Sequence, residues 1–129
     1  LEDLAFIREL QPQMIGIGPF IPHHATPFKN YPAGTLEQTL TLLSVLRLMF
    51  PKVLLPATTA LGTIVPNGRE LGILAGANVV MPNVRQNYLL YDNKLCSGAE
   101  AAEAKNDLAA RLHSIGYEIA EGRGDYKES

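Results

Sequence analysis

Residues 52–83, KVLLPATTALGTIVPNGRELGILAGANVVMPN, decide the fold, because they read as strand, loop, helix and strand. The apolar runs at 53–55 and 79–81 do not alternate apolar with polar residues. Such runs are typical of parallel strands that are covered on both faces and joined by a crossover helix. Asn67, with a glutamate three residues on, has the spacing of a capping box, and Gly76 can end the helix that it opens. We therefore predict a parallel strand–helix–strand unit.

The same pattern recurs upstream of this unit. Residues 14–17 form a further apolar run, which we expect to be the first buried strand. Gly16 and Gly18 within and after it indicate close approach of another backbone or of a ligand. Residues 19–34 contain four prolines and no helical or strand period, so they are expected to form a long loop.

The next helix begins at a second capping box, formed by Thr35 and Gln38. Apolar side chains then recur four, three, three and four residues apart, which predicts one helical stripe that Pro51 ends. The stripe comprises Leu36, Leu40, Leu43, Leu46 and Phe50. Polar residues off the stripe, including Ser44 and Arg47, are expected to face solvent.

The two ends of the chain differ in character. Residues 1–10, LEDLAFIREL, follow helical spacing from the first position without a cap, so we expect them to continue a longer polypeptide. Residues 85–95 have no clean period and predict a short irregular helix or an extended segment across a barrel mouth. Residues 99–114 predict a last helix. We therefore divide the chain into a partial barrel, 1–83, and a C-terminal extension, 84–129, whose one helix packs on it.

Three parallel strands cannot close a barrel, which usually needs about eight. Either the chain forms a small open sheet with exposed edges, or the missing strands lie elsewhere. Exposed apolar edges promote aggregation, so the pattern itself indicates a partner in the same or another polypeptide.

Composition narrows the function classes. The 129 residues carry a formal charge of −2 and a pI near 5.9, which gives no basic field for nucleic acid or an anionic membrane. The apolar runs are far shorter than a membrane span. The single cysteine, Cys96, excludes an internal disulfide and suits the reducing cytoplasm.

The polar residues Thr58, Thr59 and Asn83 lie just past the carboxyl ends of the predicted strands, where parallel α/β folds bind ligands. Thr58 and Thr59 either cap a helix or turn, or line a pocket of hydroxyl and amide groups for an anion or polar ligand. Met81 either fills the core or contacts a ligand. Tyr88 and Tyr91 suit stacking over a bound group and equally suit packing.

The sequence gives little indication of a metal site or of a catalytic motif. His23, His24 and His113 are expected to be solvated rather than metal ligands. The sequence contains no catalytic triad, carboxylate pair, phosphate loop or metal-ligand cluster, so we name no catalytic residue and no metal ligand. The residues alone predict part of a parallel α/β barrel with a polar, ligand-sized mouth.

Three stretches together resemble the C-terminal part of the HydE family, the radical SAM enzymes of FeFe-hydrogenase maturation and relatives of biotin synthase. They are MIGIGPFIPHHATPFKN (14–30), LPATTALGTIVPNGRELGILAGANVVMPN (55–83) and LYDNKLCSGAEAAE (90–103). The resemblance implies a (β/α)8 TIM-type barrel, to which this chain supplies the last three strands and a small helical extension. It also implies S-adenosylmethionine and a 4Fe-4S cluster in the full-length enzyme. The Cys-x3-Cys-x2-Cys motif for that cluster is absent here, so this segment alone should be inactive.

By resemblance, Met81 and Tyr88 match family positions that contact S-adenosylmethionine, and Thr58 and Thr59 match the pair lining the anion-binding cavity that holds substrate. The chain departs from the family in being shorter directly after Val84. Some members also bind an accessory cluster through three cysteines near the C-terminus. Cys96 matches the first, but Ala104 and Asp107 stand at the other two positions, so no accessory cluster is expected.

The resemblance implies that the full enzyme helps to build the dinuclear iron subcluster of the hydrogenase. Its 5′-deoxyadenosyl radical would act on a small cysteine-derived or iron–cysteine substrate. Its partners would be the rest of its own barrel, other hydrogenase maturation proteins and an electron donor. Alternatives are another enzyme of the biotin synthase or methylornithine synthase type, or a stand-alone, non-catalytic half-barrel that binds a partner. The PATTA loop at 56–60 favours HydE over the other enzymes.

Overall fold

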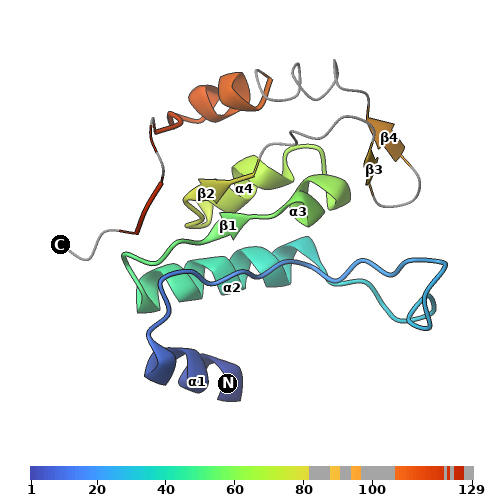
Figure 1. Cartoon of the computed structure of the whole chain (residues 1–129), viewed down its shortest axis with the longest axis horizontal. Coiled ribbons are helices and arrows are strands. Elements are labelled where there is room, and N and C mark those ends of the chain that lie inside the picture. The colour runs from blue at the N-terminus through green and yellow to red at the C-terminus, as the bar shows by residue number, and fades with distance from the viewer. Residues whose placement is uncertain (82–87, 91–93, 97–106, 121, 123, 127–129) are drawn as a thin grey trace.

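The computed structural model describes residues 1–81, 88–90, 94–96, 107–120, 122 and 124–126 (Figure 1). Its helices are α1 (Glu2–Leu10), α2 (Leu36–Met49), α3 (Thr59–Ile64) and α4 (Gly68–Leu74), and residues 107–114 are also helical. Its strands are β1 (Pro56–Ala57), β2 (Val79–Val80), β3 (Tyr88–Leu90) and β4 (Lys94–Cys96). Among the described residues, no helix is long and apolar enough to cross a membrane.

The expected parallel pairing is confirmed. Strands β1 and β2 pair in parallel, with Pro56 opposite Val79 and Ala57 opposite Val80. The first apolar run joins them through a parallel bridge between Met14 and Leu54. Two hydrogen bonds of 3.0 Å close this bridge: the Leu54 N–H donates to the Gln13 carbonyl, and the Ile15 N–H donates to the Leu54 carbonyl. The three segments thus lie in chain order, with β1 in the middle.

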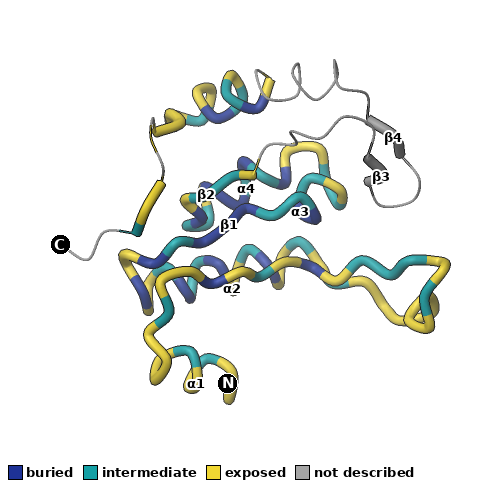
Figure 2. Tube along the Cα trace, in the orientation of Figure 1, coloured by how far each residue is buried: buried dark blue, intermediate teal, exposed yellow. Residues whose placement is uncertain are grey.

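Helix α2 forms where the sequence predicts it. The Thr35 hydroxyl accepts a 3.2 Å hydrogen bond from the Gln38 N–H, as an N-cap side chain does. Leu43 and Leu46 are completely buried and Phe50 nearly so, which places the predicted stripe in the core. Figure 2 shows the buried parts of α2, β1 and α4, whereas α1 is mostly exposed.

Two polar residues of α2 were expected to face solvent, but they bind backbone carbonyl groups instead. Ser44 donates a 2.9 Å hydrogen bond to the Ala75 carbonyl, and Arg47 Nε donates one of 2.8 Å to the Gly76 carbonyl. Burial lowers the pKa of Arg47. The expectation was wrong because these side chains reach the turn after α4, whose carbonyl groups have no partner within that helix.

Gly76 ends α4 as predicted, with a φ of 116° that strains any residue with a side chain. Its N–H donates to the Ile73 carbonyl at 2.9 Å, and the Ala77 N–H donates to the Gly72 carbonyl at 3.0 Å. This pair of bonds is the Schellman pattern. It turns the chain directly into β2.

Helix α3 was not predicted, since residues 58–66 read as a loop. Its sequence, TALGTI, contains two threonines and a glycine, which are poor helix formers, and packing against α4 supports the helix. Leu61 is completely buried, and a Cβ on Gly68 would overlap the Leu61 carbonyl. Only glycine therefore permits the close approach of the two helices.

Helix α4 begins at Asn67 as predicted, but the capping box is wrong. The Asn67 side chain makes no cap hydrogen bond. Glu70 is instead buried and paired with Arg111 on the helix of residues 107–114. Leu108 and Leu112 of that helix, 2% and 4% exposed, join the core. Helix α4 thus lies between α2 and the C-terminal helix (Figure 1).

Strands β3 and β4 pair in antiparallel fashion, with Tyr88 opposite Cys96. The extended alternative is therefore confirmed for the described residues of this segment, and its position across a barrel mouth stays a prediction. Residues 99–106 of the predicted last helix, Ala104 among them, lie outside the described residues. The closed barrel and the division at residues 83 and 84 also stay predictions.

Candidate functional site

The candidate site lies at the carboxyl edge of the parallel sheet. Thr58 directly follows β1, and Met81 directly follows β2. Because Ala57 pairs with Val80, Thr58 and Met81 occupy the next position of the same parallel register. Gly18 follows the first apolar run, and a Cβ on it would lie 2.8 Å from Thr58 Oγ1. All three segments therefore end at one place, as the sequence predicts.

Side-chain alternation determines which face of the sheet these residues share. Ala57 is buried and Val80 packs against the core, so both face the helices. Thr58 and Met81 are each one residue further along and therefore fall on the opposite face. Met14, at the bridge to β1, is 49% exposed and Met81 is 54% exposed. This second face of the sheet carries partly exposed apolar side chains.

Thr58 is the N-cap residue of α3 by position, but its hydroxyl does not cap the helix. The Thr58 carbonyl accepts a 3.1 Å hydrogen bond from the Leu61 N–H. Its Oγ1 is buried against Gly18 and has no hydrogen-bond partner among the described residues. A buried hydroxyl without a protein partner usually bonds to water or to a ligand. The alternative that this hydroxyl only caps a helix is therefore wrong.

Thr59, the second threonine, is half-buried as the first residue of α3. Its carbonyl accepts a 3.1 Å hydrogen bond from the Thr63 hydroxyl within the same helix. The structure thus brings Gly18, Thr58 and Thr59 together at the carboxyl end of β1.

Met81, at the end of β2, is 54% exposed and does not belong to the core of the described residues. Whether Met81 contacts a ligand or packs within a larger protein stays a prediction. The backbone of Tyr88 lies in β3. The link between these two residues, and Tyr91, lie outside the described residues.

His23 and His24 are neighbours in the loop of residues 19–34, and His113 lies on the helix of residues 107–114. The His23 and His24 rings are 4.3 Å apart, and His23 Nδ1 accepts a 3.2 Å hydrogen bond from the Ala25 N–H. His113 Nδ1 lies 4.0 Å from the exposed Glu118 carboxylate. Within the described part of the chain, no three His, Cys, Asp or Glu side chains are grouped to hold a metal ion.

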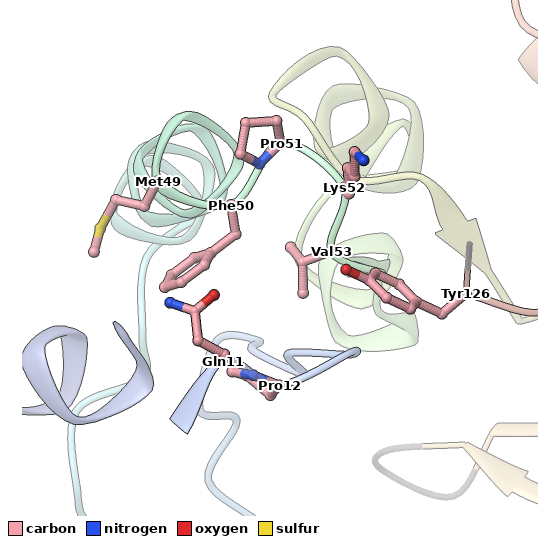
Figure 3. Close-up of a pocket in the computed structure, with 8 residues that line it drawn as sticks. All are labelled: Gln11, Pro12, Met49, Phe50, Pro51, Lys52, Val53 and Tyr126. Atoms are coloured by element: carbon pink, nitrogen blue, oxygen red, sulfur yellow. The ribbon is translucent and has the colours of Figure 1, made fainter. Parts of the chain in front are cut away.

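A cavity of about 260 Å³ lies at the other edge of the sheet (Figure 3). Phe50 and Tyr126 stand on opposite sides of it. Its lining residues are Gln11, Pro12, Met49, Phe50, Pro51, Lys52, Val53 and Tyr126. Since Pro12 and Val53 precede the paired residues of their strands, this is the amino edge and not the predicted site. Sequence reasoning missed this cavity, because three segments far apart in the chain form it.

The chain is similar to segments of three characterised proteins. Over 101 residues, or 74% of this chain, it is 48% identical to the FeFe hydrogenase maturase subunit HydE of Thermotoga maritima. The resemblance to HydE is confirmed. Two 3-methylornithine synthases, from Methanosarcina barkeri and Methanosarcina acetivorans, are 41% and 31% identical over 54% and 62% of the chain. No protein-family model matches the chain.

The similarity covers only part of each of the three relatives. The matched regions span 29% of the Thermotoga maritima HydE and 19% and 22% of the two synthases. The chain thus spans less than a third of the length of the curated relatives that it matches. All three relatives fit the radical SAM, biotin synthase-like superfamily that the sequence motifs indicate, and the chain is similar to a segment of such an enzyme.

Proposed function

We propose that the chain is the C-terminal part of a HydE-type radical SAM enzyme that matures the FeFe-hydrogenase in the cytoplasm. The observation that carries this proposal is the 48% identity to HydE over 74% of the chain. The proposed substrate is a small cysteine-derived or iron–cysteine compound. The proposed units are a partial barrel of residues 1–83 and an extension of residues 84–129.

The residues at the carboxyl edge fit a polar ligand. The buried Thr58 Oγ1 lacks a partner in the described chain and can donate a hydrogen bond to a substrate carboxylate. Thr59 would line the same cavity. Met81 is exposed at this edge and can place its thioether and methylene groups against S-adenosylmethionine, with Tyr88 as the second contact. Together these side chains would orient the two ligands and exclude water between them.

S-adenosylmethionine with a 4Fe-4S cluster supplies the adenosyl radical in such enzymes. The single cysteine of this chain cannot supply three thiolate ligands. The cluster would therefore be held by the preceding part of the polypeptide, and this segment by itself would be inactive. No accessory cluster is proposed, because Asp107 forms an ion pair with Arg111 at 3.4 Å where a cysteine would be needed.

The second face of the sheet is partly uncovered, which supports a partner. Met14 and Met81 are about half exposed there, and Leu54 and Val79 are only partly buried. The remaining strands of the barrel would cover this face and pair with the free edges of the sheet. Other hydrogenase maturation proteins and an electron donor are the further proposed partners.

The test uses the complete polypeptide with its cluster restored, and it measures 5′-deoxyadenosine formation. Met81→Ala should raise the KM for S-adenosylmethionine about tenfold, the ratio that about 1.4 kcal/mol of lost contact produces. Thr58→Val removes the hydroxyl at nearly constant shape and should weaken substrate-dependent turnover while the KM for S-adenosylmethionine stays unchanged.

Each variant has a matched control. Met49→Ala changes a methionine at the amino edge, and Thr41→Val changes an exposed threonine of α2. Both controls should behave as the unchanged protein does. If Met81→Ala and Thr58→Val are indistinguishable from these controls, the site is not at the carboxyl edge.

A second enzyme function is favoured by the identity of up to 41% to 3-methylornithine synthases. Formation of 3-methylornithine by the complete polypeptide would establish it in place of the first. The third alternative, a non-catalytic half-barrel, predicts that this chain alone forms a defined oligomer in solution and produces no 5′-deoxyadenosine.

A further inference from the structure

Arg111 makes an unusual set of contacts for a residue on the last helix. Its Nε donates a hydrogen bond to Glu70 Oε1 in the first turn of α4. Its Nη2 donates to the carbonyl of Pro66, which lies in the connection between α3 and α4. Its Nη1 reaches Asp107 on its own helix at 3.4 Å. One guanidinium thus binds two segments more than forty residues away in sequence.

The contact with Glu70 is largely shielded from water. The Glu70 side chain is only 9% exposed, whereas that of Arg111 is 36% exposed. Glu70 Oε2 has no hydrogen-bond partner among the described residues. The hydrogen bond with Glu70 raises the pKa of Arg111. Removing the guanidinium would leave a buried carboxylate without its cation, which is strongly unfavourable.

The two segments that Arg111 binds determine the position of α3. The Pro66 carbonyl lies two residues after α3 ends at Ile64. At the start of α4, Gly68 lies against the Leu61 carbonyl so closely that a Cβ would overlap it. Helix α3 has six residues and begins directly after Thr58, so a displacement of its far end moves Thr58 and Thr59.

We propose that Arg111 is a positioning residue that couples the C-terminal helix to the Thr58–Thr59 corner through Glu70 and Pro66. The helix of residues 107–114 then acts on this corner through α4 and the connection between α3 and α4. Ordering of the last helix would order the corner, and release of that helix would loosen it. The role of the corner as a ligand site rests on the proposed function, whereas the coupling rests on the contacts of Arg111.

The coupling is tested by hydrogen–deuterium exchange of the complete polypeptide, which needs no activity. Arg111→Met keeps the aliphatic stem and removes the guanidinium. It should speed amide exchange about tenfold, equivalent to about 1.4 kcal/mol, in peptides covering residues 107–116 and also in those covering 59–74. Arg111→Lys keeps the charge but loses the fork that reaches both acceptors, so it should give an intermediate effect. Glu70→Gln keeps the side-chain shape and should speed exchange in the same two regions.

Asp107→Asn is the matched control, because it removes the exposed partner of the same guanidinium. Asp107 is 63% exposed, and its removal should leave both regions unchanged. A helix that is merely held in place predicts a different result: Arg111→Met would speed exchange at 107–116 and leave 59–74 as in the unchanged protein. That result, or no change in either region, would overturn the coupling.

Kinetics then separate this proposal from the proposed function. If exchange changes as expected, Arg111→Met should lower substrate-dependent turnover like Thr58→Val and leave the KM for S-adenosylmethionine unchanged. Suppose that exchange speeds up in both regions but substrate-dependent turnover does not fall. The coupling would then stand, and the Thr58–Thr59 corner would not be the substrate site.

Discussion

Asn78 provides the sharpest test of how the sheet is held at its centre. Its side-chain oxygen accepts a 2.8 Å hydrogen bond from the Leu55 N–H, and its side-chain nitrogen donates one of 3.3 Å to the Val53 carbonyl. Leu55 is completely buried. The Asn78 side chain thus joins the start of β2 to the residues just before β1. This is a structural role for the last residue of the AGAN stretch at 75–78.

Asn78→Ala should destabilise the sheet by about 1–2 kcal/mol. A buried N–H left without a partner costs about 1–3 kcal/mol, and the longer bond to Val53 adds a few tenths. Because Asn78 itself is exposed, water can replace part of the loss, which favours the lower end of this range. Asn78→Asp retains the acceptor for Leu55 and should cost less than the alanine.

The assay is native-state hydrogen exchange at two neighbouring amides whose own bonds are retained. The Val79 N–H donates to the Leu55 carbonyl at 3.1 Å, and the Ile15 N–H donates to the Leu54 carbonyl at 3.0 Å. Asn78→Ala should speed their exchange about 5- to 30-fold, the ratio for that free energy. The control is Asn67→Ala, because the Asn67 side chain makes no cap hydrogen bond. A change no larger than that of the control would refute the bridging role of Asn78.

Two glycines give further predictions. Gly68→Ala should destabilise the protein by more than about 1 kcal/mol, since its Cβ would overlap the Leu61 carbonyl, and urea unfolding against Gly16→Ala, whose new Cβ meets nothing within 4 Å, measures this. Equal midpoints for the two variants would contradict the close approach of α3 and α4. Gly18→Ala should displace the Thr58 hydroxyl, 2.8 Å from the new Cβ, and raise the substrate KM while Gly16→Ala, with open space around it, does not. The same KM in both glycine variants would show that Gly18 does not shape the site.

The local features of the fold could be predicted because their causes lie within a few residues of each other. The Thr35 cap, the apolar stripe of α2 and the positive φ of Gly76 each depend on near neighbours or on the backbone itself. The carboxyl-edge position of Thr58 and Met81 was predictable too, since parallel strands end at one edge.

The failures concern side chains whose partners lie far away in the chain. Arg47 reaches Gly76, and Glu70 reaches Arg111, 41 residues on. Local spacing predicts that Arg47 faces solvent and that Glu70 caps its helix. In the fold, Arg47 donates to a distant backbone carbonyl and Glu70 pairs with a distant cation. Helix α3 was missed for the same reason, because its support is the surface of α4 rather than its own propensity. The amino-edge cavity depends on Tyr126 lying across from Phe50, which no local pattern indicates.

The most direct test of the central claim is the reading frame upstream of Leu1. If the chain is the C-terminal part of a radical SAM enzyme, that frame should continue for about 200 residues, as the size of a barrel requires. It should also carry a Cys-x3-Cys-x2-Cys motif. A stop codon directly before a start codon at this position would contradict the claim, because the chain would then be a half-barrel with no ligands for the cluster.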